Sequence, residues 1–189
     1  MTDHDHTAHE HTGPGYASPQ AAREQPPEQF VYVAALYEGT GIERPDFIAV
    51  VDVDPGSPVY GQIVGRTEMP NVGDELHHFG WNACSSACHS QLQRDTLIVP
   101  GFRSSNIHLL DVSDPRSPAI KQVIDGQEIK EKTGLSAPHT VHCMPGDIVT
   151  VSMLGDTEGN LPGGFAVLDA RDFSVVGRWE REKNGQELV

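Results

Sequence analysis

Histidine recurs at two places in the middle of the chain, each inside a short apolar stretch. His77 and His78 stand in ELHHFGW, and His139 and His142 stand in APHTVHC. Neutral imidazole is the most common protein ligand of transition metals, and several imidazoles that converge on one point hold an ion while leaving a coordination position open. These histidines are therefore the candidate metal ligands.

Cysteines offer a second kind of ligand. Cys84 and Cys88 lie with His89 in CSSACHSQLQR (84–94), and Cys143 lies in the second histidine stretch. Thiolate sulfur binds zinc and copper, so these residues are candidate thiol or metal contacts. A single C-x3-C pair is also consistent with two half-buried thiols, and Cys143 with a packing residue. The sequence singles out no catalytic group.

The elements that must position these side chains are short strands. The candidate segments are rich in Val, Ile, Phe and Tyr and are bounded by Gly, Pro, Asp and Asn, which predicts an all-β chain. One helix is expected in a connection, at 126–133. The predicted strands are 30–37, 46–53, 59–66, 76–82, 95–100, 106–112, 118–124, 138–143, 147–154, 164–169 and 173–179.

An internal repeat organises these strands. Segments that begin at 46, 105 and 163 each consist of an apolar strand ending in Asp, a polar turn and a second strand; the aligned residues, Asp52, Asp111 and Asp169, are 59 and 58 residues apart. Their carboxylates are expected to bond the backbone two residues further on. Four-stranded sheets at a fixed period are typical of β-propeller blades, and a β-sandwich would not explain the repeat.

The spacing of the histidines matches this repeat, since His78 and His139 are 61 residues apart. Equivalent inner strands of adjacent blades converge on one axis. However, adjacent residues and residues three apart point to opposite faces of a regular strand. Both members of each pair face the axis only if a bulge or a bend is present. Otherwise one histidine of each pair makes a hydrogen bond inside the sheet.

Composition divides the chain into a tail and a domain. Residues 1–27 are predicted to be a disordered tail, His-rich and then Pro-rich, because they lack an apolar face. Residues 28–189 are predicted to form an incomplete propeller, since about three units do not close a ring of four to eight blades. We favour the front portion of a longer protein over a unit that closes by oligomerising. The tail histidines are His4, His6, His9 and His11.

Charge and hydropathy exclude several partners. Lys and Arg total 13 against 27 Asp and Glu, a formal net charge of −14. An acidic chain repels phosphate backbones, so no nucleic acid is expected. No apolar run approaches the roughly 20 residues of a membrane span, and no apolar signal core begins the chain. We therefore expect no membrane association and a cytoplasmic location.

Several strings resemble the selenium-binding protein family, which includes methanethiol oxidases. The resemblance covers Gly13 to Glu180 and implies a seven-bladed propeller, of which this chain is similar to the N-terminal portion. The strings are GPGYASP (13–19), RPDFIAVVDVDPGSPVYGQIV (44–64), MPNVGDELHHFGWNACSSAC (69–88), HTVHC (139–143) and GGFAVLDARDFSVVGRWE (163–180).

The resemblance implies a chemistry. It is the copper-dependent oxidation of methanethiol by molecular oxygen to formaldehyde, hydrogen sulfide and hydrogen peroxide, with His77, His78, His139 and His142 at the inner histidine positions. The partners would then be a small thiol and oxygen. Selenium is a further ligand of the family, but the selenium-linked cysteine of animal members is Gly61 here, and the family's CSSC is CSSAC, which displaces Cys88 by one.

Two other functions remain open on the sequence. One is a metal- or selenium-binding protein without turnover that uses the tail and the inner histidines. The other is an interaction scaffold that recruits a partner, or associates with itself, through open blade edges by strand addition.

Overall fold

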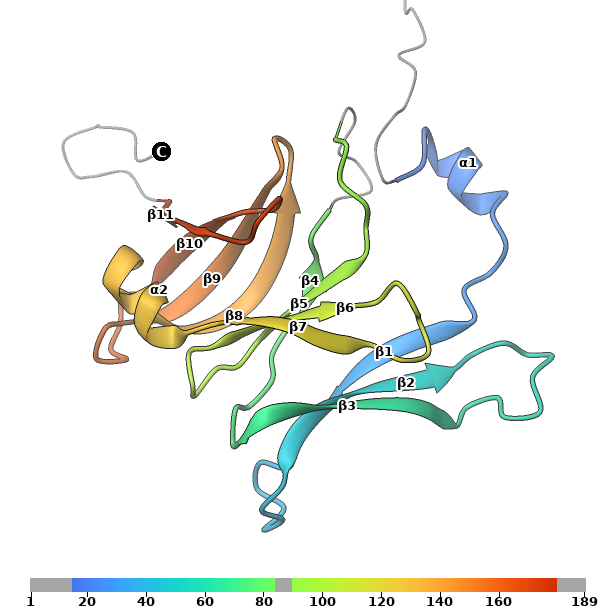
Figure 1. Cartoon of the computed structure of the whole chain (residues 1–189), viewed down its shortest axis with the longest axis horizontal. Helices are drawn as coiled ribbons and strands as arrows, with labels where there is room; N and C mark the ends of the chain where they lie inside the picture. Colours follow the sequence, from blue (N-terminus) through green and yellow to red (C-terminus); the bar gives the residue numbers. More distant parts are fainter. Residues whose placement is uncertain (1–14, 84–89, 180–189) are drawn as a thin grey trace, which may run out of the picture.

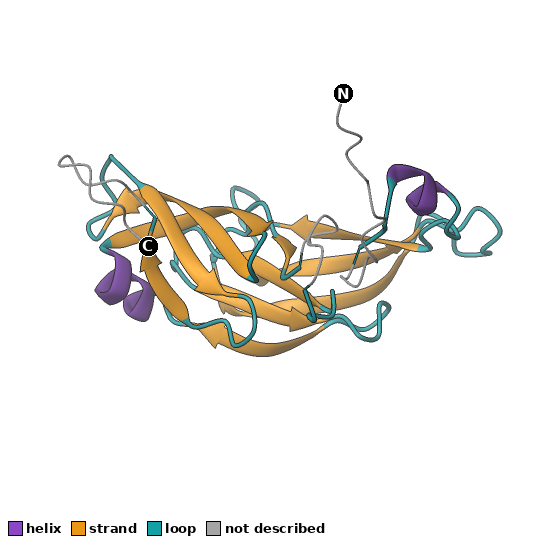
Figure 2. Cartoon of the chain, turned by 90° about the horizontal axis from the view of Figure 1, so that it is seen from above, coloured by secondary structure: helices purple, strands orange, loops and turns teal. Residues whose placement is uncertain are grey.

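The computed structural model describes residues 15–83 and 90–179. The tail histidines and the predicted contacts Cys84, Cys88 and His89 lie outside these ranges. The described residues form three antiparallel sheets that follow one another along the chain (Figure 1). Two short helices, α1 (Pro19–Arg23) and α2 (Gly126–Thr133), lie at opposite ends of the molecule (Figure 2).

Each sheet is a meander of consecutive strands, as expected for propeller blades. The first has the order β1-β2-β3, the second β4-β5-β6-β7 and the third β8-β9-β10-β11. The strands are β1 (Phe30–Ala35), β2 (Pro45–Asp52), β3 (Ile63–Val72), β4 (Gly80–Trp81), β5 (Thr96–Pro100), β6 (Ile107–Asp111), β7 (Ala119–Ile124), β8 (Leu135–Met144), β9 (Ile148–Asp156), β10 (Gly164–Asp169) and β11 (Val175–Arg178). The prediction of a partial, all-β propeller is confirmed.

The second sheet packs on both neighbours, which explains its continuous apolar strands. Leu97 and Val99 of β5 join a core with Ile48 of the first sheet. Ile98, between them in sequence, joins another core with residues of the third sheet such as Val151. Successive side chains of a strand point to opposite faces, so every residue of β5 is buried. Each fully buried Leu or Ile contributes about 1.5–3 kcal/mol to folding.

The repeating aspartates close the turns as predicted. Oδ1 of Asp52, Asp111 and Asp169 accepts a hydrogen bond from the backbone N–H two residues further on, at 3.1, 2.8 and 2.8 Å. These side chains terminate β2, β6 and β10 by satisfying the turn that follows each strand. They are structural residues.

A register break recurs at the same place in all three sheets. Val50 and Val51 pair with Gly65 and Ile63, so Val64 of β3 is an extra residue. The equivalent breaks leave one extra residue in β7, Lys121, and one in β11, Val176. A bulge bends its strand and increases the local twist. The repeat seen in the sequence is therefore also a repeat of the backbone structure.

The helices show one correct prediction and one omission. The helix expected at 126–133 is α2, which begins after the N-cap Asp125 and ends at Gly134, whose φ is 68°. Helix α1 lies within the stretch assigned to the disordered tail; Ser18 caps it by accepting from Ala21 N–H at 3.1 Å, and proline is well placed in its first turn. Neither helix of the described chain combines the length and the apolar character needed to cross a bilayer.

Candidate metal centre

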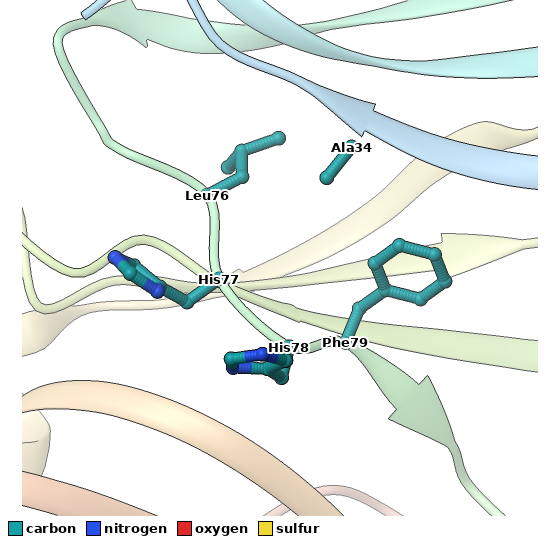
Figure 3. Close-up of a pocket in the computed structure, with 5 residues that line it drawn as sticks. All are labelled: Ala34, Leu76, His77, His78 and Phe79. Carbon is teal, nitrogen blue, oxygen red and sulfur yellow. The ribbon is translucent and has the colours of Figure 1, made fainter.

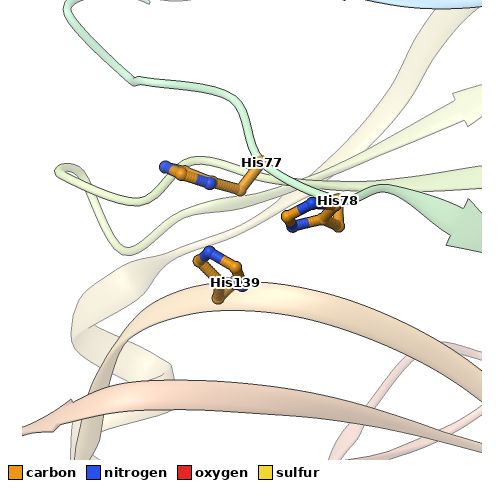
Figure 4. Close-up of side chains that lie close together, drawn as sticks. All are labelled: His77, His78 and His139. Atoms are coloured by element: carbon orange, nitrogen blue, oxygen red, sulfur yellow. The ribbon is translucent and has the colours of Figure 1, made fainter.

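Three of the four predicted histidines come together between the second and third sheets. His77 and His78 precede β4, and His139 stands on β8 and points toward them (Figure 4). One nitrogen from each ring can be chosen so that all lie within 4.8 Å of one another. The ring centroids of His77 and His78 lie 4.5 and 4.8 Å from that of His139. We call these residues the histidine cluster.

A bulge in β8 brings His139 into the cluster. Pro138 pairs with Met153 and Thr140 pairs with Ser152, so His139 is an extra residue without a partner in β9. The hydroxyl of Ser152 accepts from the Thr140 N–H at 3.0 Å and fixes the return to regular pairing. Bulges are enriched beside functional sites because they redirect a side chain. A bulge was expected if both histidines of this pair were to face the axis; the bulge is present, but only His139 of the pair joins the cluster.

A break in the preceding ladder brings His77 and His78 to one side. The segment predicted as a strand at 76–82 is a single bridge at Leu76 followed, after an irregular stretch, by β4. The N–H of His77 donates to the Pro100 carbonyl at 3.1 Å, whereas the carbonyl of His78 accepts from the Val141 N–H at 3.1 Å. The chain thus changes partner from the second sheet to the third, and strict alternation no longer holds.

Gly80 allows this close approach of β4 to β8. A Cβ at Gly80 would lie 3.0 Å from both Cγ1 and the carbonyl oxygen of Val141. These contacts are tighter than ordinary van der Waals contacts, and one of them is to backbone. The glycine therefore sets the distance between the strands that carry His78 and His139.

We predict that Gly80→Ala separates these strands. Overpacking of this kind costs about 1–3 kcal/mol of unfolding free energy, and the wider spacing should weaken metal binding. Urea denaturation and metal titration measure the two effects. Gly56→Ala is a suitable control, because a Cβ at Gly56 would meet only the Asp54 carboxylate. Gly73→Ala is not suitable, because the φ of Gly73 is 78° and alanine would be strained there. A Gly80→Ala protein with unchanged metal affinity would contradict the assigned role.

Glu75 is a side chain beside the cluster that the sequence reasoning missed. Its Oε1 lies 3.1 Å from Nε2 of His77, and its Oε2 accepts from Nε of Arg103. Burial raises the pKa of the Glu75 carboxyl, but the hydrogen bonds from His77 and Arg103 outweigh burial, so the pKa lies below its ordinary value. Glu75 stands two residues before His77 in the sequence. The E-x-H spacing of Glu75 and His77 was the sequence signal that could have identified this contact.

The surroundings of His139 favour its neutral imidazole. Burial lowers the pKa of His139, and the nearby His77 and His78 lower it further. The Nδ1 of His139 lies 2.8 Å from Oγ1 of Thr140, which leaves Nε2 available. Because a metal competes with protons for imidazole nitrogen, a lowered pKa favours binding at mildly acidic pH.

Of the remaining predicted contacts, the two that lie within the described residues, His142 and Cys143, do not join the cluster. His142 is exposed and pairs with Thr150 in the β8–β9 ladder. It lies three residues after His139 in β8 and is absent from the group of candidate metal ligands found among the described residues. Cys143 is half-buried near the end of β8.

An apolar pocket of about 360 Å³ adjoins the cluster. His77 and His78 form one side, and Ala34, Leu76 and Phe79 form the rest (Figure 3). Imidazole nitrogens therefore border a space that is otherwise lined by hydrocarbon. Such a pocket suits a small ligand with one polar and one apolar end.

A second acid–histidine pair consists of Asp74, which precedes Glu75 in the sequence, and His108 of β6. The side chains of Asp74 and His108 are fully buried, and Nε2 of His108 lies 3.2 Å from Oδ2 of Asp74. Nδ1 of His108 lies 3.3 Å from the Val99 carbonyl, which can only accept, so Nδ1 carries a proton. The Asp74–His108 contact is poorly directed for a hydrogen bond. Burial raises the pKa of Asp74, but contacts with His108 and Ser104 lower it below its ordinary value.

Known proteins match this chain over nearly all of its length. A family model described as 56kDa selenium binding protein (SBP56) matches residues 10–189. Selenium-binding protein 2 of Arabidopsis thaliana is 49% identical over 178 residues, which cover 92% of this chain and 36% of the relative. Methanethiol oxidase of Xenopus laevis is 50% identical over 173 residues, covering 90% of this chain and 36% of that protein.

A solved structure gives the same result. The X-ray structure of a hypothetical selenium-binding protein from Sulfolobus tokodaii superposes with a TM-score of 0.84 at 51% identity, covering 89% of this chain and 38% of that one. The chain thus spans about a third of the length of the curated relatives that it matches. With its repeated sheets and its matched sequence, the chain belongs to the 56kDa selenium binding protein (SBP56) family.

Proposed function

We propose that this chain carries part of the metal site of a methanethiol oxidase that uses copper. One molecule each of methanethiol, oxygen and water would give one each of formaldehyde, hydrogen sulfide and hydrogen peroxide, so that carbon is oxidised and oxygen is reduced by two electrons. The observation that carries the proposal is the convergence of His77, His78 and His139 beside an apolar pocket. Relatives named methanethiol oxidase, about 50% identical to this chain, support it.

The donor set of the cluster fits copper. Imidazole nitrogen is a good ligand for copper, and three rings leave coordination positions for other ligands. The lowered pKa of His139 keeps one ring neutral, which is the ligating form. When bound, copper would supply a redox centre that accepts thiolate sulfur and exchanges electrons with oxygen.

The residues around the cluster would orient a small thiol. Ala34, Leu76 and Phe79 offer a hydrocarbon surface for the methyl group, while the sulfur faces the imidazole side of the pocket. A charged or long substrate would lose this fit.

The test is an assay on the whole chain loaded with copper. We expect uptake of methanethiol and oxygen with release of hydrogen peroxide, and loss of all three signals in His78→Ala. Glutamine replacements of the four tail histidines provide a background without tail-bound copper. Full turnover by the His78→Ala variant would remove the metal role from the cluster.

A second candidate is binding of a metal or of selenium without turnover. The name of the Arabidopsis thaliana relatives, selenium-binding protein, favours it. In this case calorimetry detects copper binding to the tail-substituted chain and no peroxide forms. Attachment of selenium through position 61 is not part of this proposal, since Gly61 carries no thiol and has a φ of 76°.

A further inference from the structure

We infer that Glu75 is the positioning residue of the histidine cluster, which fixes His77 as the tautomer protonated at Nε2 and leaves Nδ1 to the metal. The inference deepens the proposed metal site. The assignment of Nδ1 to the metal rests on that proposed site, whereas the assignment of the tautomer does not. It begins from the contact of 3.1 Å between Oε1 of Glu75 and Nε2 of His77.

The direction of this hydrogen bond follows from the chemistry of its partners. An ionised carboxylate only accepts hydrogen bonds, so the proton must lie on Nε2 of His77. A neutral imidazole carries a single proton, and Nδ1 therefore keeps its lone pair. Carboxylates that accept from the second nitrogen of a ligating histidine orient the ring and raise its basicity.

The backbone of Glu75 is held in a strained conformation. Its φ is 54°, a left-handed conformation that side-chain-bearing residues adopt rarely. The buried carboxylate of Asp46 on β2 accepts from the Glu75 N–H at 2.8 Å, and the Phe102 N–H donates to the Glu75 carbonyl at 3.0 Å. Strained residues that their surroundings hold in this way occur preferentially at functional sites.

Arg103 determines which carboxylate oxygen of Glu75 faces His77. Its guanidinium donates from Nε to Oε2 of Glu75 and from Nη2 to Glu38 at 3.1 Å. Because Oε2 is occupied, Oε1 is left to face His77. Glu38 and Arg103 are more than half exposed, whereas Glu75 is 18% exposed. The carboxylate nearest the cluster is thus the most enclosed member of this chain of contacts.

The test reads the tautomer of His77 directly, without any metal. In metal-free protein labelled with nitrogen-15, the ring-nitrogen shifts of His77 should report a proton on Nε2. In Glu75→Gln the amide can donate or accept, so we expect a mixture of tautomers. Glu38→Gln makes the same chemical change at the outer carboxylate of Arg103 and should leave His77 unchanged.

Metal titration supplies the second readout. On the background with substituted tail histidines, Glu75→Gln should bind copper(II) about 10–100-fold more weakly, as is typical when the partner of a ligating histidine is lost. Glu38→Gln should bind like the parent. A proton on Nδ1 of His77 in the parent protein, or unchanged copper affinity in Glu75→Gln, overturns the inference. A proton on Nε2 in a parent that binds no copper supports the tautomer assignment and contradicts the proposed function instead.

Discussion

Replacing His139 with alanine is expected to abolish tight copper binding by the folded domain, whereas the same replacement of His142 should leave it unchanged. His139 is the single contribution of the third sheet to the cluster and contacts both other rings. Without it, two adjacent histidines remain, with ring centroids 6.1 Å apart. The loss should exceed the roughly 10–100-fold that removal of an outer partner costs.

The two histidines of β8 form a matched pair of variants. They lie three residues apart on one strand, but His139 is the bulged residue and His142 is in regular register with Thr150. Calorimetric titration with copper(II), on the background with substituted tail histidines, measures both affinities. Equal losses in the two variants would show that the bulge does not select the ligand. Far-ultraviolet circular dichroism confirms that each variant remains folded.

The second large effect is expected in stability, at the buried pair of Asp74 and His108. His108→Leu removes one partner and leaves the Asp74 carboxylate buried without it. Removing one member of a buried pair typically costs about 3–5 kcal/mol. Adding Asp74→Asn to His108→Leu removes the orphaned charge and should restore a large part of this loss. Urea unfolding at neutral pH measures all three proteins.

The pH dependence gives this prediction a sign. In the parent protein the pKa of Asp74 is lowered, so its contribution to stability is present above the ordinary carboxyl pKa and is lost as the pH falls through the folded value. In His108→Leu the lowering interactions with His108 are lost while those with Ser104 and Asn71 remain, so the pKa of Asp74 rises relative to the parent and the folded state takes up a proton more readily. The deficit of that variant should therefore shrink as the pH falls from 7 toward about 4.

An exposed ion pair provides the control for stability. Lys132 and Glu128 on α2 are 2.8 Å apart with nearly half of each side chain exposed. Glu128→Gln should change the unfolding free energy by no more than about 0.5 kcal/mol. A loss in His108→Leu as small as this would contradict the importance of the buried pair.

Features that depend on local sequence were predictable, and features that depend on partner strands were not. The turn aspartates, such as Asp111, and the bounds of α2 follow from short-range chemistry. The bulge at His139 depends on where β9 pairs with β8, and no residue near His139 predicts this change of register. The sequence therefore identified the histidines but could not choose between His139 and His142. Glu75 was within reach of the E-x-H pattern, but a carboxylate that supports a ligand is not marked by the spacing of the ligands themselves.

The recurring bulges in the outer strands carry a consequence for how copies of the protein meet. Strands β3, β7 and β11 form one margin of their sheets, and each is interrupted by an extra residue at the same point of the repeat. A bent, strongly twisted margin is a poor template for further strands, which protects this rim from fibril-like stacking. The opposite margin of the first sheet, at β1, has no such bulge in its pairing with β2, so unwanted growth of the sheets is expected to begin there.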